Sequence, residues 1–230
     1  MINKNKIVVT GGSGRFAQSL KKTKCKYEFI YPKKTQLDIT NLNLIRKYLK
    51  KNKISFITTR EPGGTKESEE IRKILINGRI NKWDGISETL LHYAARREHI
   101  KKKIIPELKK GRWIICDRFF HSTEAYQGAG HGVSTDFLNT LKKAVCEDLV
   151  PDITFIFDQK VEKSIQRIKN RNENNRYENF DINFHNRVRK YFKNLKNTPN
   201  KNCILINADD TIKNISDKIL LYVQQNFIQS

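Results

Sequence analysis

The chain alternates short apolar runs with longer stretches in which apolar residues recur every three or four positions. The short runs predict buried strands, and the helical spacing predicts helices that cover them. The expected strands are residues 6–10, 27–31, 54–59, 113–116, 151–158 and 203–207. The expected helices are residues 15–22, 41–51, 69–76, 87–100, 161–169, 184–192 and 212–227. This alternation predicts an α/β fold in three layers, a parallel sheet flanked by helices.

The strand at 113–116 is followed at once by a polar and glycine-rich segment, DRFFHSTEAYQGAG, at 117–130. In an open parallel sheet the ligand crevice lies outside the carboxyl ends of the strands. Asp117 and Arg118 are therefore expected where a strand ends and a binding site begins. An aspartate there can hold Mg²⁺ directly or through water, and the planar fork of an arginine can bind a phosphate. The alternative is an ion pair that only ties the loop.

Length and cysteine usage narrow the class of protein. With 230 residues the chain forms one α/β domain, or one domain with an appendage. No stretch comes near the roughly 18 apolar residues that span a bilayer, and residues 7–9 are too short a run for the apolar core of a signal peptide. The four cysteines have no metal-ligand spacing, so we interpret them as reduced thiols of a cytoplasmic protein. They are Cys25, Cys116, Cys146 and Cys203.

The net charge of +21 raises the question of a nucleic-acid partner, because clustered cations neutralise phosphates. Here the lysines are spread over nearly every segment and accompany many asparagines and isoleucines. We therefore interpret most of this charge as background composition and expect neither nucleic acid nor a membrane as partner. Some of the arginines are expected to bind phosphoryl groups.

The first fifth of the chain carries a glycine motif of its own. Gly11 ends the apolar run, and Gly12-x-Gly14-x-x-Ala17 fits the dinucleotide-binding pattern, in which glycines let the backbone approach a pyrophosphate at a helix N-terminus. The order of elements over residues 1–52 resembles the start of the short-chain reductases and epimerases, sugar-nucleotide reductases in particular. That resemblance implies a Rossmann-like βαβα segment and NAD(P) binding.

Two motifs that would settle the role of this segment are missing from the sequence. The Tyr-x-x-x-Lys catalytic pair of the reductases has no counterpart, since the spacing at Tyr93 leads to Arg97. The phosphate loop of kinases, GxxxxGK[ST], supplies a lysine to the β- and γ-phosphates and a hydroxyl to Mg²⁺, and no Gly-Lys-Ser/Thr occurs in the chain. Arg15, after Gly14, could supply charge near a phosphate, although we expect it to face solvent.

From about Ile54 to the C-terminus the chain resembles the thymidylate kinase family. The resemblance rests on REPGGT at 60–65, AAR at 94–96 and the DR…S…AYQG pattern within 117–128. It implies a nucleoside-monophosphate-kinase-like body at 53–230 that transfers a phosphoryl group from ATP to dTMP with Mg²⁺, in the synthesis of dTTP. It also implies a cytoplasmic enzyme and a homodimer.

The same resemblance implies roles for residues at the dTMP site. Arg118 would hold the dTMP phosphate, Asp117 would help to place Mg²⁺ or the phosphate, and Tyr126 would crowd the 2′ position of the sugar. The other residues implied at this site are Arg60, Glu61, Pro62, Ser122 and Gln127. A simple turn with a surface ion pair is the alternative for residues 60–65.

The helix at 87–100 carries the residues implied at the base. Arg96 stands where the family has an arginine that hydrogen-bonds thymine. One helical turn earlier the family usually has a phenylalanine that stacks on the base, and this chain has His92. Neutral imidazole can stack with less area, and a plain core or surface histidine is the alternative. His99, on the same helix, is expected at the surface.

Residues 171–178, RNENNRYE, fit the arginine-bearing lid of the family, RGxxDRxE, within a lid at about 167–180. Asn172 and Asn175 replace the usual Gly and Asp. Arg167, Arg171 and Arg176 are then expected to fold over ATP and neutralise charge that develops on the transferred phosphoryl group. A solvated basic loop is the alternative.

The sequence thus predicts a kinase body whose donor half is altered. Gly11, Gly12, Gly14 and Arg15 stand where the phosphate loop would be, and loss of its lysine and hydroxyl lowers transition-state stabilisation. The join at 51–54 fits a gene fusion as well as an error in the reading frame or assembly. The alternatives to an active kinase are a non-catalytic nucleotide-binding fusion protein that retains the dTMP site, and an NAD(P)-binding reductase fragment.

Overall fold

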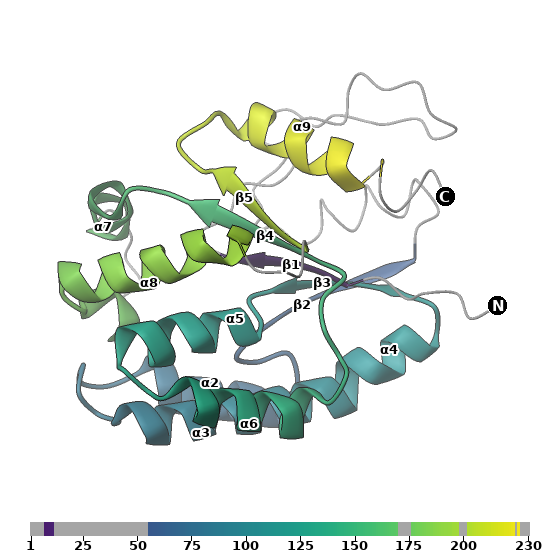
Figure 1. The fold of residues 1–230 in the computed structure, drawn as a ribbon. Helices are drawn as coiled ribbons and strands as arrows, with labels where there is room; N and C mark the ends of the chain where they lie inside the picture. Colours follow the sequence, from purple (N-terminus) through teal and green to yellow (C-terminus); the bar gives the residue numbers. More distant parts are fainter. Residues whose placement is uncertain (1–6, 12–54, 170–175, 198–201, 224, 226–230) are drawn as a thin grey trace.

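The computed structural model describes residues 7–11, 55–169, 176–197, 202–223 and 225 (Figure 1). In this part of the chain the strands form a single parallel sheet in the order β2-β3-β1-β4-β5. Their bounds are β1 Ile7–Gly11, β2 Phe56–Arg60, β3 Trp113–Asp117, β4 Ile153–Asp158 and β5 Cys203–Asn207. The predicted α/β fold with a parallel sheet is confirmed.

Helices fill the connections between the strands. The longer ones are α2 Lys66–Ile76, α3 Gly85–His99, α6 Thr135–Cys146, α7 Val161–Lys169, α8 Ile182–Asn194 and α9 Ile212–Val223. The shorter ones are η1 Ile100–Ile104, α4 Ile105–Lys109, α5 Phe120–Thr123, η2 Glu124–Gly130, η3 Arg176–Asn179 and η4 Leu195–Asn197. The sequence reasoning missed α5 and η2, because polar residues and glycines fill the segment directly after β3, and it also missed α6.

Some helices begin earlier than their apolar spacing indicated, because polar residues cap them. Thr65 accepts a hydrogen bond from the Ser68 amide, so α2 begins at Lys66. Asp84 accepts from two amides of the first turn, so α3 begins at Gly85. Capping chemistry, more than apolar periodicity, sets where these helices start.

The first strand lies in the centre of the sheet. β1 pairs with β3 on one side and with β4 on the other, with Thr10 opposite Asp117 and Gly11 opposite Ile156. The glycine motif that begins at Gly11 is thus attached to the carboxyl end of a central strand, in the same sheet as the rest of the chain. The predicted strand at 27–31 and helices at 15–22 and 41–51 lie outside the described residues.

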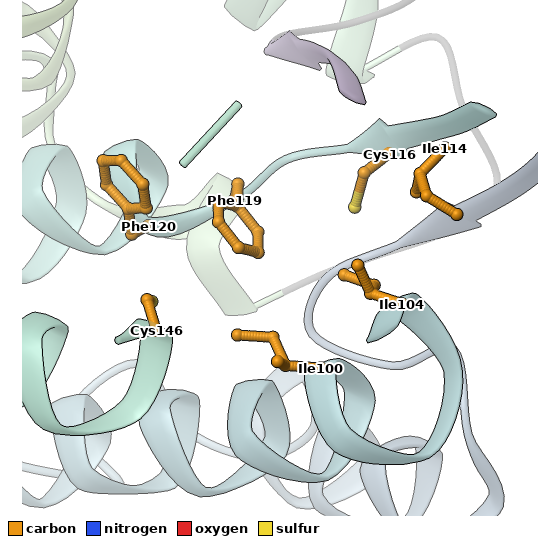
Figure 2. Close-up of a cluster of buried hydrophobic side chains, with 7 residues drawn as sticks. All are labelled: Ile100, Ile104, Ile114, Cys116, Phe119, Phe120 and Cys146. Atoms are coloured by element: carbon orange, nitrogen blue, oxygen red, sulfur yellow. The ribbon is translucent and has the colours of Figure 1, made fainter. Parts of the chain in front are cut away.

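Each face of the sheet buries its own apolar cluster, which produces the three layers. On one face, β3 packs on η1, α5 and α6 through Ile100, Ile104, Ile114, Cys116, Phe119, Phe120 and Cys146 (Figure 2). On the other face, β4 and β5 pack on α9 through Ile153, Phe155, Ile206, Ile215 and Ile219. Figure 1 shows α9 on one side of the sheet and α2, α3, α4 and α6 on the other.

The cysteines of the described ranges are reduced. Cys116, Cys146 and Cys203 are free and buried, while Cys25 lies outside these ranges. Burial raises the pKa of the Cys146 thiol to about 11, so that thiol is protonated at neutral pH. Among the helices in the described part of the chain, none is long and apolar enough to cross a bilayer.

Candidate functional site

The carboxyl ends of the strands bring together polar residues that are far apart in the sequence. Arg60 at the end of β2 and Thr10 at the end of β1 both lie opposite Asp117 in β3. The next residue, Arg118, has a backbone φ of 68°, a value that non-glycine residues rarely adopt and that is common at binding sites. The sheet therefore brings Arg60, Asp117 and Arg118, three residues of the predicted site, to one edge.

The turn that follows β2 is built on glycines that no other residue could replace without rearrangement. The Glu61 amide donates to the Asp117 carbonyl at 2.9 Å, which ties the turn to the end of β3. Gly63 and Gly64 have φ values of 133° and 93°. A Cβ atom at Gly64 would lie 2.5 Å from the His99 ring. The turn can thus lie against α3 only because the residue there is glycine.

A buried ion-pair network joins this turn to α3. Glu61, 3% exposed, accepts a hydrogen bond from Arg96 Nε at 2.7 Å through Oε2. Its other oxygen, Oε1, lies 3.1 Å from His99 Nδ1, and His99 Nε2 lies 2.6 Å from Thr59 Oγ1. The prediction that His99 is a surface residue is wrong, since its side chain is completely buried between β2 and the turn.

Three residues of α3 at four-residue spacing, Glu88, His92 and Arg96, form a polar stripe along one face of the helix. Arg96 Nη2 donates to Thr123 Oγ1 at 3.0 Å, whereas Arg96 Nη1 is buried and has no protein partner. Gln127 Nε2 donates to Glu88 Oε1 at 2.9 Å, and Gln127 Oε1 is likewise buried without a partner. A buried polar atom without a partner is costly, so these two atoms are suited to a ligand.

Thr123 is a site residue that sequence reasoning missed. Ser122 was predicted from the same motif, but its half-buried side chain makes no hydrogen bond that the structure records, while Thr123 is almost completely buried and bonded to Arg96. The position of these neighbours on the short helix α5 decides which of them faces α3. Their sequence spacing alone does not distinguish them.

A second, more exposed group of charges lies beside the first. Arg72 of α2 donates to the Pro62 carbonyl at 3.0 Å, and burial, followed by repulsion from Arg60, lowers its pKa. Arg118 lies with its guanidinium carbon 5.4 Å from the centre of the Tyr126 ring and adds to the positive charge around Arg72. Arg60 is held by Glu69 at 3.0 Å, with both side chains partly exposed.

Tyr177, the residue after the predicted lid arginine Arg176, contacts His92 of α3 and Tyr126 of η2. Tyr177 Oη lies 2.9 Å from His92 Nε2, and the Tyr177 ring meets the Tyr126 ring edge-on at 5.8 Å between centroids. Burial, followed by the charges of Arg96 and other arginines, lowers the pKa of His92 to about 3. His92 is therefore neutral at physiological pH.

Arg176 differs from the expected lid arginine. It donates to the Leu75 and Ile80 carbonyls, at 3.1 and 2.8 Å, and pairs with Glu88 Oε2 at 2.6 Å. Both side chains of this pair are completely buried, because α2, α3 and η3 close over them. The guanidinium is thus held in the interior by protein partners. Arg171, Gly12, Gly14 and Arg15 lie outside the described residues, as does the side chain of Arg167.

The described residues contain no group of three or more His, Cys, Asp or Glu side chains that could hold a metal ion without help from a substrate. Asp117 is exposed at the carboxyl edge beside Arg118. A single exposed carboxylate suits Mg²⁺, which usually keeps several waters and binds through one or two carboxylates together with substrate phosphates.

Comparison with known proteins agrees with this geometry. The family model described as thymidylate kinase matches residues 39–219. The chain is 41% identical to a thymidylate kinase of Vesicomyosocius okutanii, over 80% of this chain and 90% of the relative. It is 37% identical to that of Clostridium novyi, over 78% and 89%. A crystal structure of thymidylate kinase from Ehrlichia chaffeensis superposes with a TM-score of 0.65 at 27% identity, covering 96% of this chain and 100% of that one.

The family match begins at residue 39, before Ile54, where the resemblance to the family was expected to begin. Residues 39–52 therefore lie within the matched region. The resemblance of the preceding residues to reductases stays a prediction.

Proposed function

The chain belongs to the thymidylate kinase family, and we propose that its site at the ends of β2 and β3 binds dTMP as acceptor of a phosphoryl group from ATP. The observation that carries the assignment to this site is the buried, unpartnered Nη1 of Arg96. Nη1 is a hydrogen-bond donor, and thymine offers the O4 carbonyl as acceptor. The ion pair with Glu61 holds the guanidinium in place for that bond.

The remaining acceptor-site residues divide between the base and the sugar. Gln127 Oε1 is a free buried acceptor for the base or for a water beside it. Tyr126, edge-on to Tyr177, crowds the 2′ position and favours deoxyribose. Glu61 and Pro62 act through the turn, since the Glu61 side chain positions Arg96 and the Pro62 carbonyl positions Arg72. Ser122 lies beside Thr123 on the short helix α5.

The phosphate of dTMP is assigned to the exposed group of arginines. Arg60, Arg72 and Arg118 are opposed nearby by Glu69 and Asp117, which leaves an excess of positive charge. An arriving phosphate satisfies that excess through charge-assisted hydrogen bonds. Phosphoryl transfer depends on positioned charge more than on a protein nucleophile. These arginines therefore supply the charge that binding of the acceptor phosphate requires.

Asp117 is the residue that would hold Mg²⁺ at this edge, directly or through water. When bound, the ion neutralises charge on the phosphate oxygens. On the donor side, Gly11, Gly12, Gly14 and Arg15 are proposed to contact the phosphates of ATP, with Arg167 and Arg171 from the lid. Gly11 ends a central strand, where a phosphate-binding loop is expected in such a sheet.

Two rival proposals keep the same fold but no kinase reaction. A non-catalytic protein would retain the dTMP site and lack turnover. An NAD(P)-binding protein would use the glycine motif at 11–14 for a dinucleotide. We also propose a cytoplasmic homodimer, supported by free buried cysteines and by exposed Ile86 and Leu90 on one face of α3.

The test is a coupled assay of ADP release by the purified chain with ATP, Mg²⁺ and dTMP. Arg118→Ala is expected to lower kcat about 10²- to 10³-fold, the usual effect of removing one preorganised charge. Arg112→Ala is the matched control, because Arg112 directly precedes β3 at its opposite end. No turnover, with dTMP still raising the melting temperature, would favour the non-catalytic protein. Stabilisation by NADPH and not by dTMP would favour the dinucleotide-binding protein.

A further inference from the structure

The contact between His92 and Tyr177 connects two segments that are 85 residues apart. His92 lies on the polar stripe of α3, and Tyr177 lies in η3, within the predicted lid at about 167–180. Their Nε2 and Oη atoms are 2.9 Å apart, and their ring centroids are 6.1 Å apart at 52°. The rings are therefore tilted and do not stack, so the polar contact is what joins them.

The protonation states of both groups favour one hydrogen bond. Burial and four surrounding arginines keep the imidazole neutral, so one ring nitrogen is available as an acceptor. Burial, followed by the charge of Glu88 and a hydrogen bond with it, raises the pKa of Tyr177, so its hydroxyl stays protonated at neutral pH. The hydroxyl is thus shared between Glu88 and His92, and the neutral imidazole either accepts its proton or donates Nε2–H to Oη.

The neighbouring residue fixes η3 independently. Arg176 pairs with Glu88, which lies one helical turn before His92 on α3. Arg176 thus anchors the backbone of η3, while the contacts of the Tyr177 hydroxyl with His92 and Glu88 set the direction of the next side chain. Tyr177 in turn meets Tyr126 edge-on, and Tyr126 lies beneath the guanidinium of Arg118.

We propose that His92 is a positioning residue that acts through Tyr177: its imidazole holds the tyrosine hydroxyl so that Tyr177 and Tyr126 form a fixed wall on the sugar side of the acceptor site. The proposal rests on the dTMP site proposed above and adds a specificity role to it. The phenylalanine usual at this position in related kinases offers a ring but no hydrogen-bonding nitrogen. This chain therefore has a contact that such a residue cannot make.

The competing explanation is that His92 acts only as a flat ring beside the base. His92→Phe separates the two, because it keeps an aromatic ring and removes the nitrogen. Tyr177→Phe removes the hydroxyl from the other side. If the hydrogen bond is what matters, each change removes the same interaction, and the double variant loses little more than either single one.

The experiment is a double-mutant cycle on the full chain, with the dissociation constant of dTMP measured by calorimetry. Each single variant is expected to weaken binding about fivefold, the size of one hydrogen bond, and the double variant also about fivefold. The ratio of affinities for dTMP and the ribose analogue UMP is expected to fall in all three. Melting temperatures of the four proteins show whether each is folded.

Two comparison variants make the cycle specific. His92→Gln retains an amide that can hydrogen-bond the Tyr177 hydroxyl, so alone it should weaken binding little, and with Tyr177→Phe it should lose no more than Tyr177→Phe alone. His131→Phe changes a histidine that lies against Phe180 and Phe184, and with Tyr177→Phe it should give losses that multiply. Multiplying losses at His92 and Tyr177, with wild-type dTMP binding intact, would overturn this inference alone. Absence of dTMP binding in the wild-type chain would overturn the proposed function as well.

Discussion

The two ends of the proposed acceptor site hold their arginines in opposite ways. At the base end, Arg96 is 2% exposed and pairs with an equally buried Glu61. At the phosphate end, Arg60 and its partner Glu69 have side chains 52% and 35% exposed. The first pair cannot move without leaving a buried charge, whereas the second can exchange its partner for water or a ligand. Buried pairing suits recognition of a fixed base edge, and exposed surplus charge suits capture of a hydrated phosphate.

Removing the acid of the buried pair is expected to have the largest effect. In Glu61→Ala both Arg96 and His99 lose their partner in the interior, so the free energy of unfolding should fall by about 3–5 kcal/mol. Urea unfolding followed by circular dichroism measures this. Glu147→Ala is the control, since Glu147 also pairs with two cations but is exposed, and it should change the unfolding midpoint little. Equal effects of the two variants would remove the distinction between buried and exposed pairs.

Arg176→Ala tests whether the buried arginine of η3 belongs with the base end or with the lid. Its loss leaves Glu88 unpaired and two carbonyls without their donor, so we expect destabilisation by about 3 kcal/mol or more. Arg187→Ala, which removes one bond to the Gly130 carbonyl, should cost about 1 kcal/mol. A fall in kcat at unchanged stability would restore the original prediction of a lid residue that contacts ATP.

Lower pH should reduce the free energy of unfolding, because buried histidines must then take up protons. The pKa of His92 is lowered to about 3 and that of His121 to about 4, mainly by burial, against an ordinary value of 6.5. Below pH 6.5 the unfolded state binds more protons than the folded one, so stability present at pH 7 is lost as pH falls toward 4. The slope approaches about 1.4 kcal/mol per pH unit for each histidine. Urea midpoints measured from pH 7 to 4 should flatten in His92→Phe and His121→Phe.

Arg72→Ala sharpens the comparison at the phosphate end. Loss of one arginine should weaken dTMP binding about tenfold, or 1.4 kcal/mol, and leave thymidine binding unchanged, because thymidine has no phosphate. The loss should shrink as salt rises, since this end is partly exposed. Calorimetry with both ligands at two salt concentrations measures this, with Arg97→Ala as a surface control. Equal weakening of both ligands would place Arg72 at the base instead.

Glu69→Ala should have the smallest effect on stability. The pair with Arg60 is partly exposed, and such pairs contribute at most about 1 kcal/mol. The Gly64 amide also loses an acceptor, but water can replace it at this edge. A destabilisation as large as that of Glu61→Ala, measured under the same urea conditions, would show that exposure does not distinguish the two ends.

The sequence alone determined the five strands of the described sheet and the edge at which the proposed site lies. A strand buried on both faces requires an uninterrupted apolar run, and the polar residues that end it must lie at the edge. Asp117 and Arg118 were located in this way, and so was the turn at Arg60. The glycines at 63 and 64 also follow from the sequence, because backbone with positive φ tolerates little else.

The tertiary structure alone decided which polar side chains became buried and with which partners. Glu61 and His99 are 38 residues apart, Arg96 and Thr123 are 27 apart, and Arg176 and Glu88 are 88 apart. No local pattern records such pairings, since helical and strand periodicity reports only which face of its own element a residue lies on. From the sequence, His99 was therefore expected at the surface and Arg176 in the lid. The packing of α2, α3 and η3 around them makes both part of the interior.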